Sequence, residues 1–279
     1  MLKILKVALF TLVLFIPSLI YSQFSTFEIY GTKPAGLADI SSVLTGIDAS
    51  YTNIAGLQEL TGSRINMHYQ NRFGITELKV LGLAYGINIR KLGAFAFTLK
   101  EFGIEEYNEF EAGLGYARKL TSALSGGLQF NFFNLAIKGY GSRSSVSFNA
   151  GLQYTLNNNI MIGFSAINPF PVRFTSSASL PSIIAAGIRY NAGEKVVFYS
   201  EIEKHIDLEY AVKIALEYNI TRAFCIYGGY INSPSTYAGY SFGFGYSGWK
   251  KMILEMSVKY NITLGLSPSI GFTYIFTPR

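Results

Sequence analysis

The stretch from Ser145 to Leu156, SVSFNAGLQYTL, alternates apolar or aromatic side chains with serine, asparagine, glycine, glutamine and threonine. The stretch from Glu209 to Ile220, EYAVKIALEYNI, repeats the pattern, with alanine, asparagine or a charge at every second position. Successive side chains of a β-strand point to opposite faces of the sheet. Each stretch therefore predicts a strand with one apolar face and one polar face.

Alternating segments of this kind recur along the chain, about 14 in all. A water-soluble β-sandwich needs only roughly seven to nine strands in about 100 residues. An even number of such segments is typical of an outer-membrane barrel, because a closed sheet satisfies every backbone group in hydrocarbon. The sequence predicts an all-β fold, a transmembrane antiparallel β-barrel. Its strands are expected at 63–71, 76–90, 94–103, 108–118, 124–137, 145–156, 160–167, 182–191, 195–205, 208–219, 222–231, 237–247, 251–262 and 268–276.

The composition of the 279 residues favours a membrane environment over water. Charged residues make up 14 % and aromatic residues 15 %, and the mean hydropathy is +0.27. So much apolar surface excludes intrinsic disorder. Cys225 is the single cysteine, and His68 and His205 lie far apart, so neither a disulfide scaffold nor a metal cluster is expected. We predict no enzymatic activity and no cofactor.

Residues 1–22 have the form of a cleaved export signal. Two lysines precede the apolar run VALFTLVLFIPSLI, and Ser22 supplies a small residue at the cleavage site. A retained N-terminal anchor is the alternative, but the run is short for a span of about 20 apolar residues. The expected location is the bacterial outer membrane.

Residues 23–60 do not alternate and are rich in alanine, glycine and serine. About 14 strands enclose a lumen wider than that of an eight-stranded barrel, and such a lumen needs filling. We predict that this segment is an N-terminal plug within the lumen, and a periplasmic tail is the alternative. Near-helical spacing of four apolar residues favours an ordered segment; these are Ile40, Val43, Leu44 and Ile47.

The links between the predicted strands are short at one end of the barrel, as in Lys91-Leu92-Gly93 and Asn157-Asn158-Asn159. Asparagine and glycine supply the positive φ angles that tight hairpins need. The longest link is NPFPVRFTSSASLP, residues 168–181. Its apolar side chains suggest a contact surface for a partner protein, or a lid over the mouth; they are Phe170, Val172 and Phe174.

The segment from Gly31 to Leu57, GTKPAGLADISSVLTGIDASYTNIAGL, resembles the N-terminal signature of FadL/PorV-like outer-membrane proteins. That family has a small-residue stretch, an aspartate, and an Asn-Pro-Ala-Gly-Leu or Asn-Gln-Ala-Gly-Leu box before its first strand. Here Ile54 stands in place of proline or glutamine. The matching positions are Gly31, Ala35, Gly36, Ala38, Asp48, Asn53, Ala55, Gly56 and Leu57.

The resemblance implies a non-enzymatic 14-stranded barrel with an N-terminal plug. Its FadL branch moves hydrophobic small molecules, whereas its PorV/PorQ branch serves type IX secretion as a partner of other outer-membrane or secreted proteins. Long outer loops that could form an apolar entry groove are mostly missing, so we favour the PorV/PorQ-like partner. Hydrophobic uptake remains the alternative. It predicts an apolar path from the outer mouth to a side opening in the wall, whereas a partner protein predicts a sealed lumen.

Charges on the polar faces of the predicted strands are expected to face the lumen and to pair with one another. The alternative is an ion-selective conduit, which needs charges of one sign at a constriction. These lumen charges are Arg90, Glu209, Lys213, Glu217, Glu255 and Lys259.

The remaining titratable groups have ordinary expected roles. His68 is expected to be a hydrogen-bonded strand residue rather than the base of a hydrolase, and His205 a solvated residue in an outer turn. The net charge of +6 does not indicate nucleic-acid binding, because the cations are scattered through turns. Pairs at strand ends, such as Arg118 and Lys119, are instead expected to meet lipid head groups.

Overall fold

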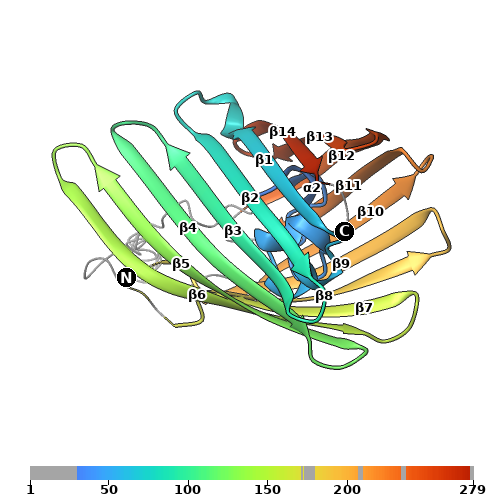
Figure 1. Cartoon of the computed structure of the whole chain (residues 1–279). Helices are drawn as coiled ribbons and strands as arrows, with labels where there is room; N and C mark the ends of the chain where they lie inside the picture. The colour runs from blue at the N-terminus through green and yellow to red at the C-terminus, as the bar shows by residue number, and fades with distance from the viewer. Residues whose placement is uncertain (1–29, 171, 173–179, 207–209, 234–236, 277–279) are drawn as a thin grey trace, which may run out of the picture.

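Fourteen antiparallel strands close into a barrel around the N-terminal part of the chain (Figure 1). The computed structural model describes residues 30–170, 172, 180–206, 210–233 and 237–276. Each strand pairs with its neighbours in sequence, and β1 (Ser63–Asn71) pairs with β14 (Gly265–Ile275) to complete the ring. The closed antiparallel barrel predicted from the alternation is therefore confirmed. The predicted export signal, residues 1–22, lies outside the described residues.

The strand bounds agree closely with the alternating segments. Between β1 and β14 the strands are β2 (Lys79–Ile89), β3 (Gly93–Gly103), β4 (Tyr107–Lys119), β5 (Leu124–Ile137), β6 (Gly141–Thr155), β7 (Ile160–Ile167), β8 (Ile183–Ala192), β9 (Val196–His205), β10 (Tyr210–Asn219), β11 (Phe224–Ser233), β12 (Tyr237–Trp249) and β13 (Met252–Asn261).

The alternation places large apolar side chains on the outer face of the wall. Leu114, Phe130 and Val146 are 66 %, 66 % and 71 % exposed, and similar residues follow on every strand. The side chains at the alternate positions face inward and are buried, as are those of Asn149 and Gln153 on β6. A soluble monomer rarely exposes such a large apolar area, because each side chain would be in contact with water. The outer face is therefore suited to hydrocarbon.

The two ends of the barrel differ in their connections. One end, called the turn end here, carries the start of β1, the end of β14 and tight turns such as residues 90–92 and 250–251. The other end, called the loop end, carries residues 168–182 and 72–78, the latter containing η4 (Arg72–Gly74). Lys91 adopts a φ of 79° in its turn. The Asn157 turn works differently from the expected positive φ, because its Oδ1 accepts hydrogen bonds from the N–H groups of Asn159 and Ile160.

Residues 30–62, called the lumen segment here, lie inside the ring of strands (Figure 1). The segment contains α2 (Thr32–Gly36) and two 3₁₀ helices, η2 (Gly46–Ser50) and η3 (Ile54–Glu59). Ile40, Val43 and Leu44 are buried, but their near-helical spacing corresponds to turns rather than to a helix. Each helix that the structure describes is too short or too polar for a membrane span.

The hydrophobic core lies between the lumen segment and the inner face of the wall. Ile47, Tyr51 and Leu57 pack against small inward side chains such as Ala84 and Ala96. On the other side of the lumen, Leu37 and Ile40 belong to a second cluster with Val197, Tyr199 and Tyr227. The small residues of the polar strand faces thus leave the space that the lumen segment occupies.

Candidate functional site

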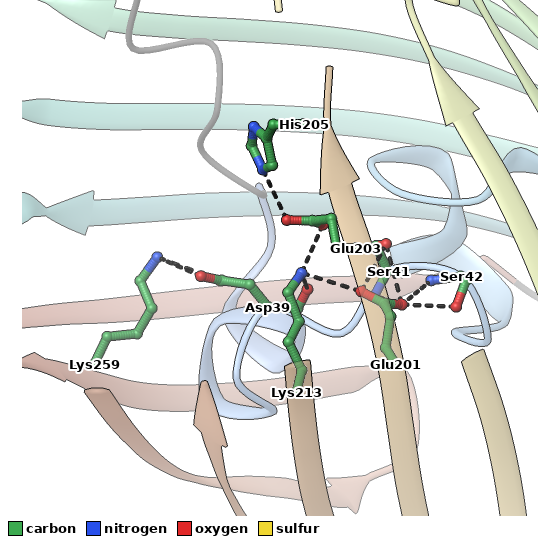
Figure 2. A network of polar contacts seen from close by, with 8 residues as sticks. All are labelled: Asp39, Ser41, Ser42, Glu201, Glu203, His205, Lys213 and Lys259. Carbon is green, nitrogen blue, oxygen red and sulfur yellow. Dashed lines mark hydrogen bonds and ion pairs between the residues drawn. The ribbon is translucent and has the colours of Figure 1, made fainter. Parts of the chain in front are cut away.

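The lumen segment is attached to β9 and β10 through a buried lysine. Lys213 Nζ donates to Glu201 Oε1 at 3.0 Å, to Glu203 Oε2 at 2.7 Å and to the carbonyl of Asp39 at 2.7 Å (Figure 2). The side chains of Lys213 and Glu201 are 1 % and 0 % exposed. At such burial an ammonium needs its partners, since an unpaired charge in a low-dielectric interior is very costly. We call the residues drawn in Figure 2 the Lys213 network.

Glu201 also binds the backbone of the lumen segment. Its Oε2 accepts hydrogen bonds from the N–H of Ser41 at 2.8 Å, the N–H of Ser42 at 2.7 Å and the hydroxyl of Ser42 at 2.7 Å. Ala38 and Asp39 precede this turn with left-handed φ angles of 56° each. Non-glycine residues adopt this conformation infrequently, so the network holds a turn that the local sequence alone disfavours.

His205 and Lys259 belong to the Lys213 network through Glu203 and Asp39, without contacting Lys213 themselves. His205 Nε2 lies 2.9 Å from Glu203 Oε1, and His205 is 7 % exposed. The expectation of a solvated turn histidine is therefore wrong: His205 ends β9, where the parity of the strand directs it inward. Lys259 Nζ on β13 lies 3.2 Å from Asp39 Oδ2, so the aspartate links a third strand to the lumen segment.

A second ion pair joins α2 to β10. Lys33 Nζ lies 3.0 Å from the Glu217 carboxylate, which also accepts a hydrogen bond from the Tyr199 hydroxyl at 2.8 Å. Burial by itself lowers the pKa of the Lys33 ammonium, but the nearby Glu217 carboxylate outweighs it and raises that pKa above its ordinary value. Lys33 stays charged at any physiological pH.

Asn53, the first residue of the Asn-Ile-Ala-Gly-Leu box, joins the lumen segment to β6 and β7. Its Oδ1 accepts the N–H of Ala55 at 3.1 Å and begins η3. Its Nδ2 lies within hydrogen-bond distance of three carbonyl oxygens, those of Ser42 at 2.6 Å, Phe164 at 3.0 Å and Leu152 at 3.2 Å. One amide thereby fixes two parts of the lumen segment to each other and to the wall.

Glycines in the wall allow this close approach. A Cβ added to Gly151 would lie 1.8 Å from Asn53 Oδ1, and one added to Gly163 would lie 2.0 Å from the carbonyl oxygen of Ser42. Within the box, a Cβ on Gly56 would lie 2.1 Å from the carbonyl oxygen of Leu44. Glycine is therefore required at these positions, by a backbone carbonyl at Gly163 and Gly56 and by the Asn53 amide at Gly151.

Asp48 of η2 lies at the turn end, in a polar cavity of about 240 Å³ that Lys33, Arg64 and Glu255 also line. Burial is the main influence on its carboxyl and raises its pKa to about 6, although the positive charges of Lys33 and Arg64 act in the opposite direction. Asp48 Oδ1 has no hydrogen-bond partner among the described residues.

The six expected lumen charges have different positions. Lys213, Glu217 and Lys259 face inward, but among the described residues they pair with charges of the lumen segment or β9 and not, as expected from the sequence, with one another. Glu255 is buried in the cavity at the turn end. Arg90 is exposed in the turn after β2 and does not lie in the lumen, because the strand ends before it. Glu209 lies outside the described residues.

The expected partner loop is only partly a free surface. Phe170 is 67 % exposed, and its ring lies 5.5 Å from that of Phe148. Val172 instead packs on the inner cluster of Phe133, Leu135 and Leu180, so it covers the lumen rather than facing a partner. Phe174 lies outside the described residues.

His68 and Cys225 lie on inward faces. His68 is 2 % exposed, and its Nδ1 lies 2.9 Å from Thr32 Oγ1 of the lumen segment, away from either rim. Cys225 on β11 is half-buried, with Sγ 3.8 Å from the carbonyl oxygen of Gly245. Both side chains pack at the boundary between wall and lumen.

The arrangement as a whole fixes a short chain segment inside the barrel by paired charges and amide contacts. Several contributors on β9 and in the lumen segment could not be recognised from the sequence. β9 reads VVFYSEIEKH, in which an inward valine and tyrosine precede the acids, so its inner face has no clear polar signature. The missed residues are Lys33, Asp39, Ser41, Ser42, Glu201 and Glu203.

The three-dimensional arrangement matches several solved outer-membrane channels. The toluene transporter TodX of Pseudomonas putida has a TM-score of 0.71 at 12 % identity, over 91 % of this chain and 100 % of TodX. This chain has the fold of the FadL-type barrels. The toluene transporter TbuX of Ralstonia pickettii gives 0.67 at 10 % identity, over 89 % of this chain and 98 % of TbuX. A FadL homologue of Pseudomonas aeruginosa gives 0.62 at 10 % identity, over 88 % and 98 %.

No protein-family model matches the chain, and no curated protein matches it in sequence. At identities of 10–12 %, the structural matches establish the fold alone.

Proposed function

We propose that the protein is a FadL-like channel of the bacterial outer membrane that admits hydrophobic small molecules. The likeness to hydrocarbon transporters over nearly the whole chain supports this role. The apolar outer face and the export signal predicted for residues 1–22 support the location. Tight turns are usual on the periplasmic side of such barrels, so we assign the turn end to the periplasm.

The proposal depends chiefly on the lumen segment, which we infer to be a plug. It is buried among inward side chains from strands all around the ring and is held by the Lys213 network, Lys33 and Asn53. A wide aqueous pore of the porin kind does not fit a lumen filled in this way. We infer that a solute passes only when the plug moves or the wall opens.

The described wall is closed. Neighbouring strands pair with continuous register, and the one shift lies between Tyr246 and Trp249.

A closed wall and short outer connections also suit the second candidate function, a PorV/PorQ-like partner in type IX secretion or surface assembly. Mild-detergent purification with mass spectrometry of associated proteins tests it. A stable complex with secreted or outer-membrane proteins would favour this candidate over the channel.

Uptake by a plug-locked variant tests the channel directly. Ser42 in the lumen segment and Gly187 in β8 lie close enough to be cross-linked by cysteines. A Cβ on Gly187 would approach Ser42 Oγ to 2.4 Å, so the two must move slightly apart to reach disulfide geometry. The variant carries Ser42→Cys, Gly187→Cys and Cys225→Ser. Proteoliposomes are loaded with an enzyme that consumes toluene or oleate, and product formation reports uptake.

We expect the reduced variant to take up toluene or oleate faster than protein-free vesicles, and the oxidised variant to fall to the protein-free rate. Dithiothreitol should reduce the disulfide and restore uptake by the oxidised variant, which gives a control within the same sample. A Cys225→Ser protein should respond to neither oxidant nor reductant. Uptake no faster than in protein-free vesicles would refute the channel, whereas uptake unaffected by the disulfide would refute only movement of the plug.

A further inference from the structure

A groove of about 650 Å³ runs over the outer face of the wall, on the side that faces away from the lumen segment. It crosses strands β4 to β8, and nearly all of its lining is apolar. Ridges of large side chains border it; they are Tyr116, Leu120, Leu128, Leu152, Phe164 and Ile184.

The floor of the groove is made of small residues on three adjacent strands. Gly126-Gly127 of β5, Ala150-Gly151 of β6 and Ser165-Ala166 of β7 lie side by side, with Gly127 paired to Gly151 and Ala150 to Ala166. The outward members are Gly126, Ala150 and Ala166. Since they project little, the large side chains on either side stand above them and leave a depression between.

Arg118 lies at the turn end of this groove. It is the next outward residue of β4 after Tyr116, opposite Gly126 of β5, and it is exposed. No carboxylate forms a salt bridge with it among the described residues. A guanidinium presents several N–H donors in a planar fork that suits a phosphate group.

A second apolar groove on the outer face provides a contrast. It has about 590 Å³, crosses β1–β4, β13 and β14, and has Glu101 among its lining residues. Glu101 Oε1 accepts a hydrogen bond from Asn108. Lys100 also lines this groove, but its ammonium pairs with Glu111 at 2.9 Å. Since a carboxylate repels a phosphate, the two grooves differ in the charge that they offer to a lipid head group.

We propose that the groove over β4–β8 binds one glycerophospholipid of the periplasmic leaflet, with an acyl chain along the small-residue floor and its phosphate on Arg118. The position of Arg118 at the turn end places the phosphate at the periplasmic interface. This inference uses the membrane orientation of the proposed function but does not require that the barrel conduct any solute.

Native mass spectrometry of the detergent-purified full chain tests the site. The probes are phosphatidylglycerol and a galactosyl diacylglycerol with the same acyl chains, which lacks phosphate. We expect the wild type to retain one phosphatidylglycerol in preference to the galactolipid. Arg118→Gln should weaken that retention about tenfold, since a charge-assisted hydrogen bond is lost. Lys250→Gln, which removes a cation from another turn at the same end, should leave it unchanged.

A second variant tests the floor without changing charge. Ala150→Leu fills the groove and should displace the lipid, whereas Ala112→Leu, an outward substitution outside the groove, should not. Equal retention by Arg118→Gln and wild type, or equal retention of both lipids, would overturn the proposal. So would unchanged retention in Ala150→Leu. Heat-modifiable migration in gels confirms that each variant is folded, and failure of the uptake assay alone would leave this site intact.

Discussion

Lys213 Nζ and Glu201 Oε1 lie 3.0 Å apart inside the barrel, on neighbouring strands and with almost no exposed surface. The same carboxylate accepts the N–H groups of Ser41 and Ser42, so one ion pair contacts both the wall and the lumen segment. A pair of this kind adds little stability compared with apolar side chains of equal size, but removal of one partner leaves an uncompensated charge. The Lys213 network therefore specifies where the lumen segment is held.

Lys213→Met should destabilise the protein by about 3–5 kcal/mol, because Glu201 and Glu203 would remain buried without their cation. Urea unfolding in lipid vesicles measures this change. Lys119→Met is the matched control: Lys119 pairs with Glu59 at 3.3 Å, but both side chains are about half exposed. An exposed pair contributes less than about 1 kcal/mol. Equal effects of the two substitutions would show that burial of the Lys213 pair has no energetic consequence.

The barrel could be predicted from the sequence because its signal is local. Val146, Phe148 and Leu152 alternate with serine, asparagine and glutamine whatever the rest of the chain does, and the same parity determines the lipid-facing side. Strand ends were missed where a strand continues without apolar alternation, as at residues 141–144, Gly-Ser-Arg-Ser, which extend β6.

The attachment of the lumen segment could not be predicted in the same way. Glu201 and Ser42 lie 159 positions apart, and their contact depends on how the plug folds within the closed ring. Lys213 was identified as a lumen charge from parity, but its partners on β9 and in the plug were not. Asn53 was identified through a family resemblance, which did not indicate the wall carbonyls that it contacts.

Asn53→Ala should loosen the plug without opening the barrel. The substitution removes the amide that lies near the carbonyls of Ser42, Phe164 and Leu152. Each buried carbonyl left without a hydrogen bond lowers the free energy of unfolding by roughly 1 kcal/mol or more. Hydrogen exchange should become faster in residues 30–62 and stay slow in the strands. Asn134→Ala, at an exposed asparagine of β5, should leave both rates unchanged. Retained protection of residues 30–62 in Asn53→Ala would contradict the anchoring role.

Asp48 should make stability fall as the pH rises from about 4 to about 6. Its pKa is about 6 in the folded protein and about 3.9 in an unfolded chain, so folding takes up a proton between these values. Below pH 4 the carboxyl is protonated in both states and has no effect. Above pH 6 the buried charge lowers stability, and Asp48→Asn should then be more stable than wild type by about 2 kcal/mol.

Urea unfolding in vesicles at pH 4, 5, 6 and 7 follows this difference. Glu59→Gln, which removes an exposed carboxylate of the same segment, is the control and should show no comparable gain above pH 6. A difference between Asp48→Asn and wild type that does not change with pH would exclude the titration of Asp48 as its cause.

Gly151→Ala should displace the plug by sterics alone. The new methyl group would lie 1.8 Å from Asn53 Oδ1, so the amide or the strand must move. We expect faster exchange and easier proteolysis of residues 30–62, with unchanged strand content by circular dichroism. Gly82→Ala is the matched control, since its methyl group would meet only ordinary contacts at 3.4–3.5 Å, including Tyr51 of the plug. If residues 30–62 exchange at the same rate in both variants, the close approach of Asn53 to β6 does not determine the position of the lumen segment.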